Sequence, residues 1–105
     1  MKAVTYTKKD IVQRVAKAVK APDLQTRAFV DNTFKVMAQM LTEDHGRGRL
    51  RIEIRNFGVL EVKPTKAKPK ARNPRTNEIV YVPAHRKTHF KAGKIIREEL
   101  RKPLK

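Results

Sequence analysis

Residues 63–83, KPTKAKPKARNPRTNEIVYVP, contain four of the six prolines in the chain. The first thirteen of these residues carry six positive charges and no negative one. Proline removes a backbone hydrogen-bond donor and like charges repel one another, so this stretch is poor material for a packed core. The segment EIVYV that follows has the composition of a β-strand. The chain therefore places a long basic excursion inside a predicted sheet, and its fold must accommodate it.

The charge balance of the chain predicts a polyanionic partner. Lys and Arg number 26 and Asp and Glu number 10, which gives a net charge of +16. Residues 1–46 carry 8 basic and 5 acidic side chains, whereas residues 47–105 carry 18 and 5. A surface that serves only solubility mixes its charges, so this asymmetry indicates a binding face in the second part. Nucleic acid is the default polyanion, and an anionic membrane or an acidic protein is the alternative.

The length of 105 residues predicts a single domain, residues 1–105. The absence of cysteine excludes disulfides and thiolate chemistry and suits a reducing compartment. The N-terminal segment lacks the apolar run of a signal peptide, and no stretch approaches the length of a transmembrane helix. We therefore expect an intracellular protein.

Two helices are predicted in the first part of the chain, residues 5–45. Thr7 and Asp10 have the spacing of a capping box, and the residue before Pro22 resists the helical conformation. The first helix has one apolar stripe, formed by Ile11, Val12, Val15, Ala16 and Val19. The second, from about Asp23 to about Thr42, is apolar over a wider arc, formed by Leu24, Phe29, Val30, Phe34, Val36, Met37, Met40 and Leu41. One helix cannot cover so wide an arc, which suggests a second subunit.

The second part of the chain predicts a sheet, an arm and a last helix. Leu50, Ile52 and Ile54 alternate with charged residues, as in a half-buried antiparallel strand. We expect VLEV to return as a second strand and residues 78–82 to form a third, so that the sheet and arm span about 49–84. A short helix is predicted at about 88–102, with Phe90, Ile95, Ile96 and Leu100 inward. The predicted class is α+β.

Three stretches in this order resemble the HU / integration host factor family of bacterial DNA-bending proteins. They are IEIRNFGVLEV, RNPRTNE and VPAHRKTHFKAGK. The resemblance implies an intertwined homodimer, or a heterodimer with a paralogue, whose helical body contains two N-terminal helices and one C-terminal helix. A three-stranded antiparallel sheet would extend into one long β-ribbon arm per subunit, and the two arms would embrace double-stranded DNA. Each arm tip would place Pro74 between base pairs from the minor-groove side.

Some positions depart from the family pattern. Asn56 and Asn77 stand where glycine is usual, and asparagine adopts positive φ more readily than most residues. Both turns are therefore expected to form. The arm carries extra prolines at positions 64 and 69 and is slightly longer than usual, which bears on its register.

Pro74 has two interpretations. NPRT alone is a good type I turn, which makes Pro74 an ordinary turn residue. Between Arg72 and Arg75, however, a rigid apolar ring can enter a base step without loss of side-chain entropy, while its neighbours hold phosphates or groove edges. Together with the family resemblance, this favours intercalation.

Two groups of polar residues are the candidate DNA contacts. The arm group is Lys63, Lys66, Lys68, Lys70, Arg72, Asn73 and Arg75. The body group is Arg86, Lys87, Lys91 and Lys94, placed near the N-terminus of the last helix, with Arg55 as a weaker candidate on the polar strand face. Charged runs often serve only solubility, and this is the alternative for both. In the arm no acidic residue interrupts the run, and helix N-terminal amides together with lysines suit phosphate in the body.

Catalysis and metal binding find no support in the sequence. His85 and His89 are four residues apart, but HRKTH lacks the glutamate of a His-Glu-x-x-His site, and no cysteine or acidic cluster accompanies it. No nucleophile–base pair or phosphate-binding glycine loop is present. The phenylalanines fit a core better than stacking platforms. We therefore expect no enzyme activity, no cofactor, no metal and no small-molecule substrate.

The predicted function is architectural DNA binding. Many Lys and Arg residues suit phosphates, whereas few Asn or Gln residues are available to read base edges, so little sequence specificity is expected. The protein would bend duplex DNA through the minor groove and help to compact the nucleoid in the cytoplasm. A basic RNA-binding structural protein, such as a ribosomal component, is the main alternative. An adaptor for acidic proteins or membranes is a third, and it lacks a strongly cationic amphipathic helix.

Overall fold

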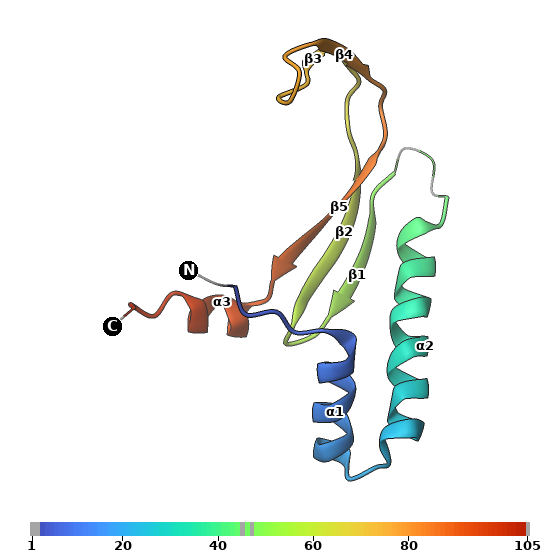
Figure 1. Cartoon of the computed structure of the whole chain (residues 1–105), viewed down its shortest axis with the longest axis vertical. Coiled ribbons are helices and arrows are strands. Elements are labelled where there is room, and N and C mark those ends of the chain that lie inside the picture. Colours follow the sequence, from blue (N-terminus) through green and yellow to red (C-terminus); the bar gives the residue numbers. More distant parts are fainter. Residues whose placement is uncertain (1–2, 45, 47, 105) are drawn as a thin grey trace. The chain divides into compact units, whose positions relative to one another are not determined.

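The computed structural model describes residues 3–44, 46 and 48–104, which fall into two compact units, Met1–Thr42 and Glu43–Lys105. Within the described residues, three helices and five strands follow one another in the order α1-α2-β1-β2-β3-β4-β5-α3 (Figure 1). All strand pairs are antiparallel. The predicted α+β class is confirmed, and the single-domain boundaries stay a prediction.

The first unit is a pair of helices, α1 (Lys8–Val19) and α2 (Asp23–Thr42). The Asp10 carboxylate accepts hydrogen bonds from the backbone N–H and the hydroxyl of Thr7, at 2.8 and 3.0 Å, and these bonds hold the pKa of Asp10 below its usual value. Lys20 ends α1 in the left-handed conformation, with φ of 57°, and α2 begins directly after Pro22. Both predicted helices and the Thr7 cap are confirmed.

The buried part of the helical unit is small. Val12 and Ala16 of α1 and Thr26 and Val30 of α2 are buried, and the Thr26 hydroxyl donates to the Pro22 carbonyl at 2.9 Å. Most of the wide apolar arc of α2 stays uncovered in the free chain, with Phe29 67% exposed. Other exposed apolar residues of α2 are Leu24, Phe34, Val36 and Met40. An apolar surface of this kind calls for a protein partner.

The second unit contains a three-stranded sheet of β1 (Leu50–Ile54), β2 (Gly58–Pro64) and β5 (Arg86–Ala92), with β2 in the middle. Side chains alternate between the two faces of a sheet. One face carries the apolar residues Leu50, Ile52, Ile54, Leu60, Val62 and Phe90. The opposite face, which we call the charged face, carries Arg51, Glu53, Glu61, Lys63, Lys87, His89 and Lys91.

The identity of the third strand differs from the prediction. Residues 79–82 form β4 (Ile79–Val82), which pairs with β3 (Lys68–Arg72), and β5 completes the three-stranded sheet. The last helix α3 is Lys94–Leu100, so the expected start near residue 88 is wrong. Phe90 lies on β5 opposite Leu60, and its ring centroid is 5.4 Å from that of Phe57. This packing keeps the segment before Gly93 extended.

The turn between β1 and β2 depends on two backbone features. The Phe57 N–H donates to the Ile54 carbonyl at 3.0 Å, and Asn56 adopts φ of 65°, as its place in a glycine position predicts. Gly58 then lies so close to β5 that an added Cβ would be 2.4 Å from the Lys91 carbonyl oxygen. The Gly93 N–H donates to the Phe57 carbonyl at 2.8 Å and joins the start of α3 to the same turn.

Candidate nucleic-acid interface

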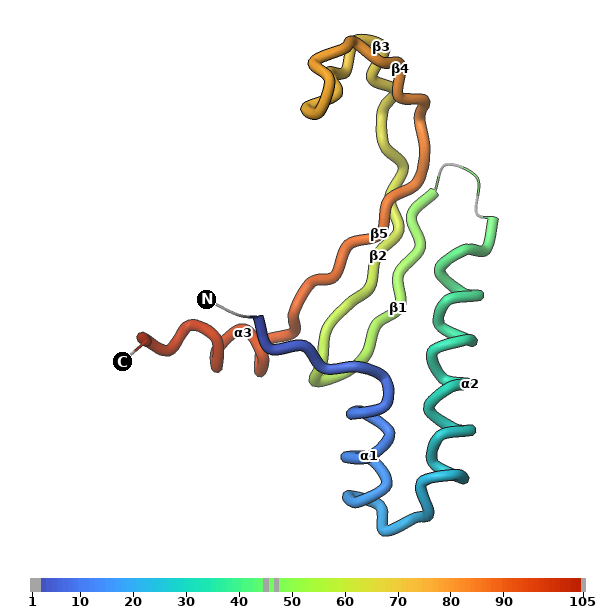
Figure 2. Tube along the Cα trace, viewed as in Figure 1, coloured from blue at the N-terminus to red at the C-terminus, as the bar shows by residue number. Residues whose placement is uncertain are grey.

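The arm is a ribbon that continues β2 and β5 into the hairpin of β3 and β4 (Figure 2). The last pair of the main sheet is Pro64 with Arg86, and the first pair of the hairpin is Lys68 with Val82, so residues 65–67 face an equal number in 83–85. Thr65 and His85 bridge this interval. The Thr65 N–H donates to the His85 carbonyl at 2.7 Å, and the His85 N–H donates to the Thr65 hydroxyl at 3.2 Å.

The extra prolines of the arm lie where the ladder does not need their missing N–H groups. The Thr65 N–H points toward β5, so the backbone nitrogen of the preceding Pro64 points to the opposite side. On that side β1 does not reach Pro64, because its first residue, Leu50, pairs with Val62. Pro69 lies in a β-bulge of β3, where the register shifts between Lys68 and Ala71. A bulge takes up one additional residue and increases local twist. The bulge gives a place for the additional arm residue that the family resemblance leads us to expect.

The arm tip is a closed loop with Pro74 at its exposed end. The Asn73 N–H donates to the Glu78 carbonyl at 2.8 Å, and the Asn77 N–H donates to the Asn73 carbonyl at 2.7 Å. The Asn73 side chain accepts from the Arg75 N–H at 3.0 Å, so Asn73 shapes the loop that presents Pro74. Asn77 adopts φ of 64°, which confirms the expectation for this glycine position.

The arm cations lie in a row along the ribbon that leads to this tip. Lys63 ends the charged face, Lys66 lies beside the Thr65–His85 bridge, and Lys68, Lys70 and Arg72 follow on β3. The Arg72 guanidinium donates to the Asn77 side-chain oxygen at 3.1 Å, which fixes it next to the loop. Except for half-buried Lys63, the cations of this set are exposed. The arrangement offers a line of positive charge that ends at an exposed proline.

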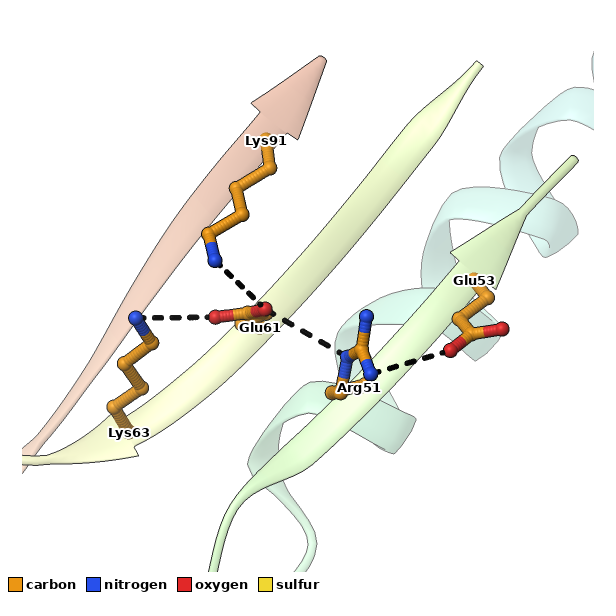
Figure 3. Close-up of polar contacts among 5 residues, drawn as sticks. All are labelled: Arg51, Glu53, Glu61, Lys63 and Lys91. Carbon is orange, nitrogen blue, oxygen red and sulfur yellow. Dashed lines mark ion pairs between the residues drawn. The ribbon is translucent and has the colours of Figure 1, made fainter. Parts of the chain in front are cut away.

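The charged face gathers its cations around one buried carboxylate. Glu61, at the centre of β2, has a side chain only 6% exposed and pairs with a cation from each strand of the sheet (Figure 3). The carboxylate oxygens lie 3.2 Å from Lys63 Nζ, 3.5 Å from Lys91 Nζ and 3.6 Å from Arg51 Nε. Close contact with the Lys63 ammonium, together with the charges of Lys63 and Lys91, holds the pKa of Glu61 below its usual value in spite of burial. Glu61 thus allows three like charges to converge.

The predicted body contacts lie on different elements than expected. Arg86, Lys87 and Lys91 belong to β5 and not to the N-terminus of a helix, whereas Lys94 is the first residue of α3. Lys87 and Lys91 share the charged face with Lys63, and Arg55 lies in the turn after β1. Arg86 points from the opposite face, and its guanidinium donates to the Glu43 carbonyl. The structure therefore brings Lys63, Lys87 and Lys91 together and leaves Arg86 apart from them.

Comparison with known proteins places the chain in a family. A model of the family described as bacterial DNA-binding protein matches residues 6–101. The chain belongs to this family, which includes HU and integration host factor. It is 35% identical to the integration host factor subunit beta of Hahella chejuensis over 94% of this chain and 96% of that protein. It is 37% identical to the corresponding subunit of Neisseria meningitidis over 94% and 95%.

A solved structure shows the same fold. The chain matches the structure titled "Anabaena HU-DNA cocrystal structure" with a TM-score of 0.77 and 28% sequence identity, over 93% of this chain and 100% of that chain. The predicted membership of the HU / integration host factor family is confirmed. Members of this family are architectural DNA-binding proteins and not enzymes. No helix in the described part of the chain is long and apolar enough to cross a membrane.

Glu61 and strand β5 are the parts of this HU-like interface that sequence reasoning missed. Glu61 follows three apolar or small residues in GVLEV, and nothing in the segment indicates that Arg51 and Lys91 from other strands join Lys63 around it. The sequence signal for β5 is a weak alternation of Thr88, Phe90 and Ala92, which is too slight to indicate a strand by itself. His85 and His89 are not part of any cluster of three or more metal-ligating side chains among residues 3–44, 46 and 48–104.

Replacement of Glu61 by glutamine is expected to lower stability near neutral pH and to have a smaller effect in acid. The folded-state pKa of Glu61 is depressed, so its ionised form contributes stability above 4.5, the ordinary glutamate value, and loses that contribution as pH falls through the folded value. Urea unfolding of both proteins at about pH 7 and about pH 3 measures the difference. The depressed pKa of Asp10 also makes stability depend on pH, but Asp10 is present in both proteins, so its contribution cancels in the difference.

Glu53→Gln is the matched control for this measurement. Glu53 lies on the same face and its carboxylate is 3.4 Å from the Arg51 guanidinium, but its side chain is 68% exposed. Exposed pairs contribute little, so this variant should resemble the wild-type protein at both pH values. An equal effect of the two substitutions at neutral pH would contradict the role assigned to Glu61.

Proposed function

We propose that the protein acts as a dimer that clasps duplex DNA between two arms, enters the minor groove and bends the DNA by inserting Pro74 into a base step. The observation that carries this proposal is the arm tip. Pro74 is exposed at the end of a basic ribbon, in a loop shaped by Asn73 and flanked by Arg72 and Arg75. Unstacking a base step costs a few kcal/mol, which the additional contacts of the bent duplex offset.

The phosphate contacts proposed for the dimer come from arm and body together. The arm supplies Lys63, Lys66, Lys68, Lys70, Arg72, Asn73 and Arg75. The body supplies Arg55, Arg86, Lys87, Lys91 and Lys94. Because these are mainly phosphate-binding side chains, the protein binds with little sequence specificity and helps to organise the nucleoid.

The exposed apolar residues support the dimer. Among the described residues no large side chain is fully buried, and the buried apolar residues are Val12, Ala16, Val30 and Val62. A second subunit would cover the apolar arc of α2, where Phe29 is 67% exposed. Either an identical chain or a paralogue satisfies this requirement.

A titration of the purified protein tests the proposal. We expect a dimer mass in solution and binding that weakens steeply with salt, with a slope of about −0.9 for each phosphate contact. Nicked and mismatched duplexes should bind more tightly than intact duplex because they kink at lower cost. Double-stranded RNA is the competitor, and it should bind more weakly because its A-form grooves differ in width and depth from those of duplex DNA. A monomer that binds RNA as tightly as nicked DNA would contradict the proposal.

A further inference from the structure

Strand β4 exposes two large apolar side chains on one face of the arm. Ile79 is 63% exposed and Tyr81 is 64% exposed, and residues two apart on a strand lie on the same face. Val80, on the other face, is less exposed at 37%, and Val82 is half-buried. The arm ribbon therefore has one partly covered face and one face that offers Ile79 and Tyr81 to a partner.

Cations accompany this apolar pair. Ile79 is paired with Arg72 in the register of the hairpin, and Tyr81 falls opposite the bulge between Lys68 and Ala71. In residues 63–85 the acidic residues are limited to Glu78, against six Lys and Arg residues. The surface around the pair is thus positively charged, and a partner must combine negative charge with apolar groups.

The groove of a nucleic acid duplex has this combination, because its deoxyribose rings present C–H surfaces between rows of phosphates. We propose that Ile79 and Tyr81 contact the sugar edges of duplex DNA while neighbouring cations hold the phosphates, an inference that rests on the proposed function. Tyrosine suits such a boundary, since its ring is apolar and its hydroxyl can meet a phosphate or water. The pair contributes affinity that does not depend on counterion release.

This contribution is separable from that of the cations by its salt dependence. Each lost phosphate contact reduces the slope of log affinity against log salt by about 0.9, whereas loss of an apolar contact lowers affinity at every salt concentration and leaves the slope unchanged. Single substitutions on the arm can therefore distinguish a phosphate contact from an apolar contact. A matched cation is Lys70, which lies on β3 and is exposed.

The experiment measures duplex affinity over a range of salt for the wild-type protein and single variants. Tyr81→Ala and Ile79→Ala are each expected to weaken binding about fivefold to tenfold with the wild-type slope. A dimer carries two Lys70 side chains, so Lys70→Ala should reduce the slope by about 1.8, which is about 0.9 for each lost phosphate contact. Tyr81→Phe should keep most of the affinity because the ring supplies the contact. Tyr6→Ala is the control for removing an exposed tyrosine, since Tyr6 is 63% exposed and lies outside the arm; it should bind as the wild type does.

Three outcomes would overturn the inference. If the wild-type protein binds duplex DNA and Tyr81→Ala binds it equally well, the inference fails and the proposed function stands. If Tyr81→Ala changes the mass of the protein in solution, the pair belongs to a protein contact. If the wild-type protein binds no duplex, the proposed function fails and this inference fails with it.

Discussion

Replacement of Gly58 by alanine is expected to destabilise the sheet by about 3 kcal/mol, a large share of the stability of a small domain. An added Cβ would be 2.4 Å from the Lys91 carbonyl oxygen and 2.7 Å from a ring carbon of Phe90. The carbonyl belongs to the backbone of β5, so it can retreat only by separating β2 from β5. Urea unfolding, monitored by circular dichroism, measures the loss.

Gly46→Ala is the control for the removal of a glycine. Gly46 has φ of 63° and no atom within 4 Å of an added Cβ, so its substitution costs only backbone strain, about 1 kcal/mol. A Gly58→Ala protein as stable as Gly46→Ala would show that β2 and β5 are not packed as described.

Replacement of Pro74 by alanine is expected to lower the rate of ring closure of a short duplex about tenfold, because the wedge that unstacks a base step is removed and the DNA bends less. The cations of the arm remain, so the slope of affinity against salt should change little. Asn73 and Asn77 still close the loop through their backbone bond of 2.7 Å, so the tip should keep its fold. The rate of closure of short linear duplexes at saturating protein measures the effect.

Pro69→Ala is the control that tests whether DNA bending depends on Pro74 in particular or on any proline of the arm. Pro69 lies in the bulge of β3 and away from the tip, so its replacement should alter arm stiffness and leave most of the bending intact. Equal bending by the wild-type and Pro74→Ala proteins would remove the wedge from the proposed mechanism.

The local elements were predictable because their signals are local. Thr7 and Asp10 mark the start of α1, alternation marks β1, and asparagine at positions 56 and 77 was compatible with turns that need positive φ. The family motifs likewise placed Pro74 at the arm tip, where the structure also has it. Each of these features depends on residues within a few positions of one another.

The parts that sequence reasoning missed depend on contacts between distant segments. β5 is strongly charged and has little apolar alternation, and it is a strand because Phe90 packs against Phe57 and because β2 supplies its hydrogen bonds. The burial of Glu61 depends on Arg51, Lys63 and Lys91 from three strands. Neither arrangement follows from periodicity, since register sets which side chains meet.

The most direct test of the account is the change in energy transfer between dyes at the two ends of a short duplex when the wild-type protein is added. A dimer that clasps and kinks the duplex brings the ends together, so transfer should rise as the complex forms and fall again when salt dissociates it. Saturated binding with unchanged transfer would show a protein that coats DNA without bending it, and that result would contradict the central claim.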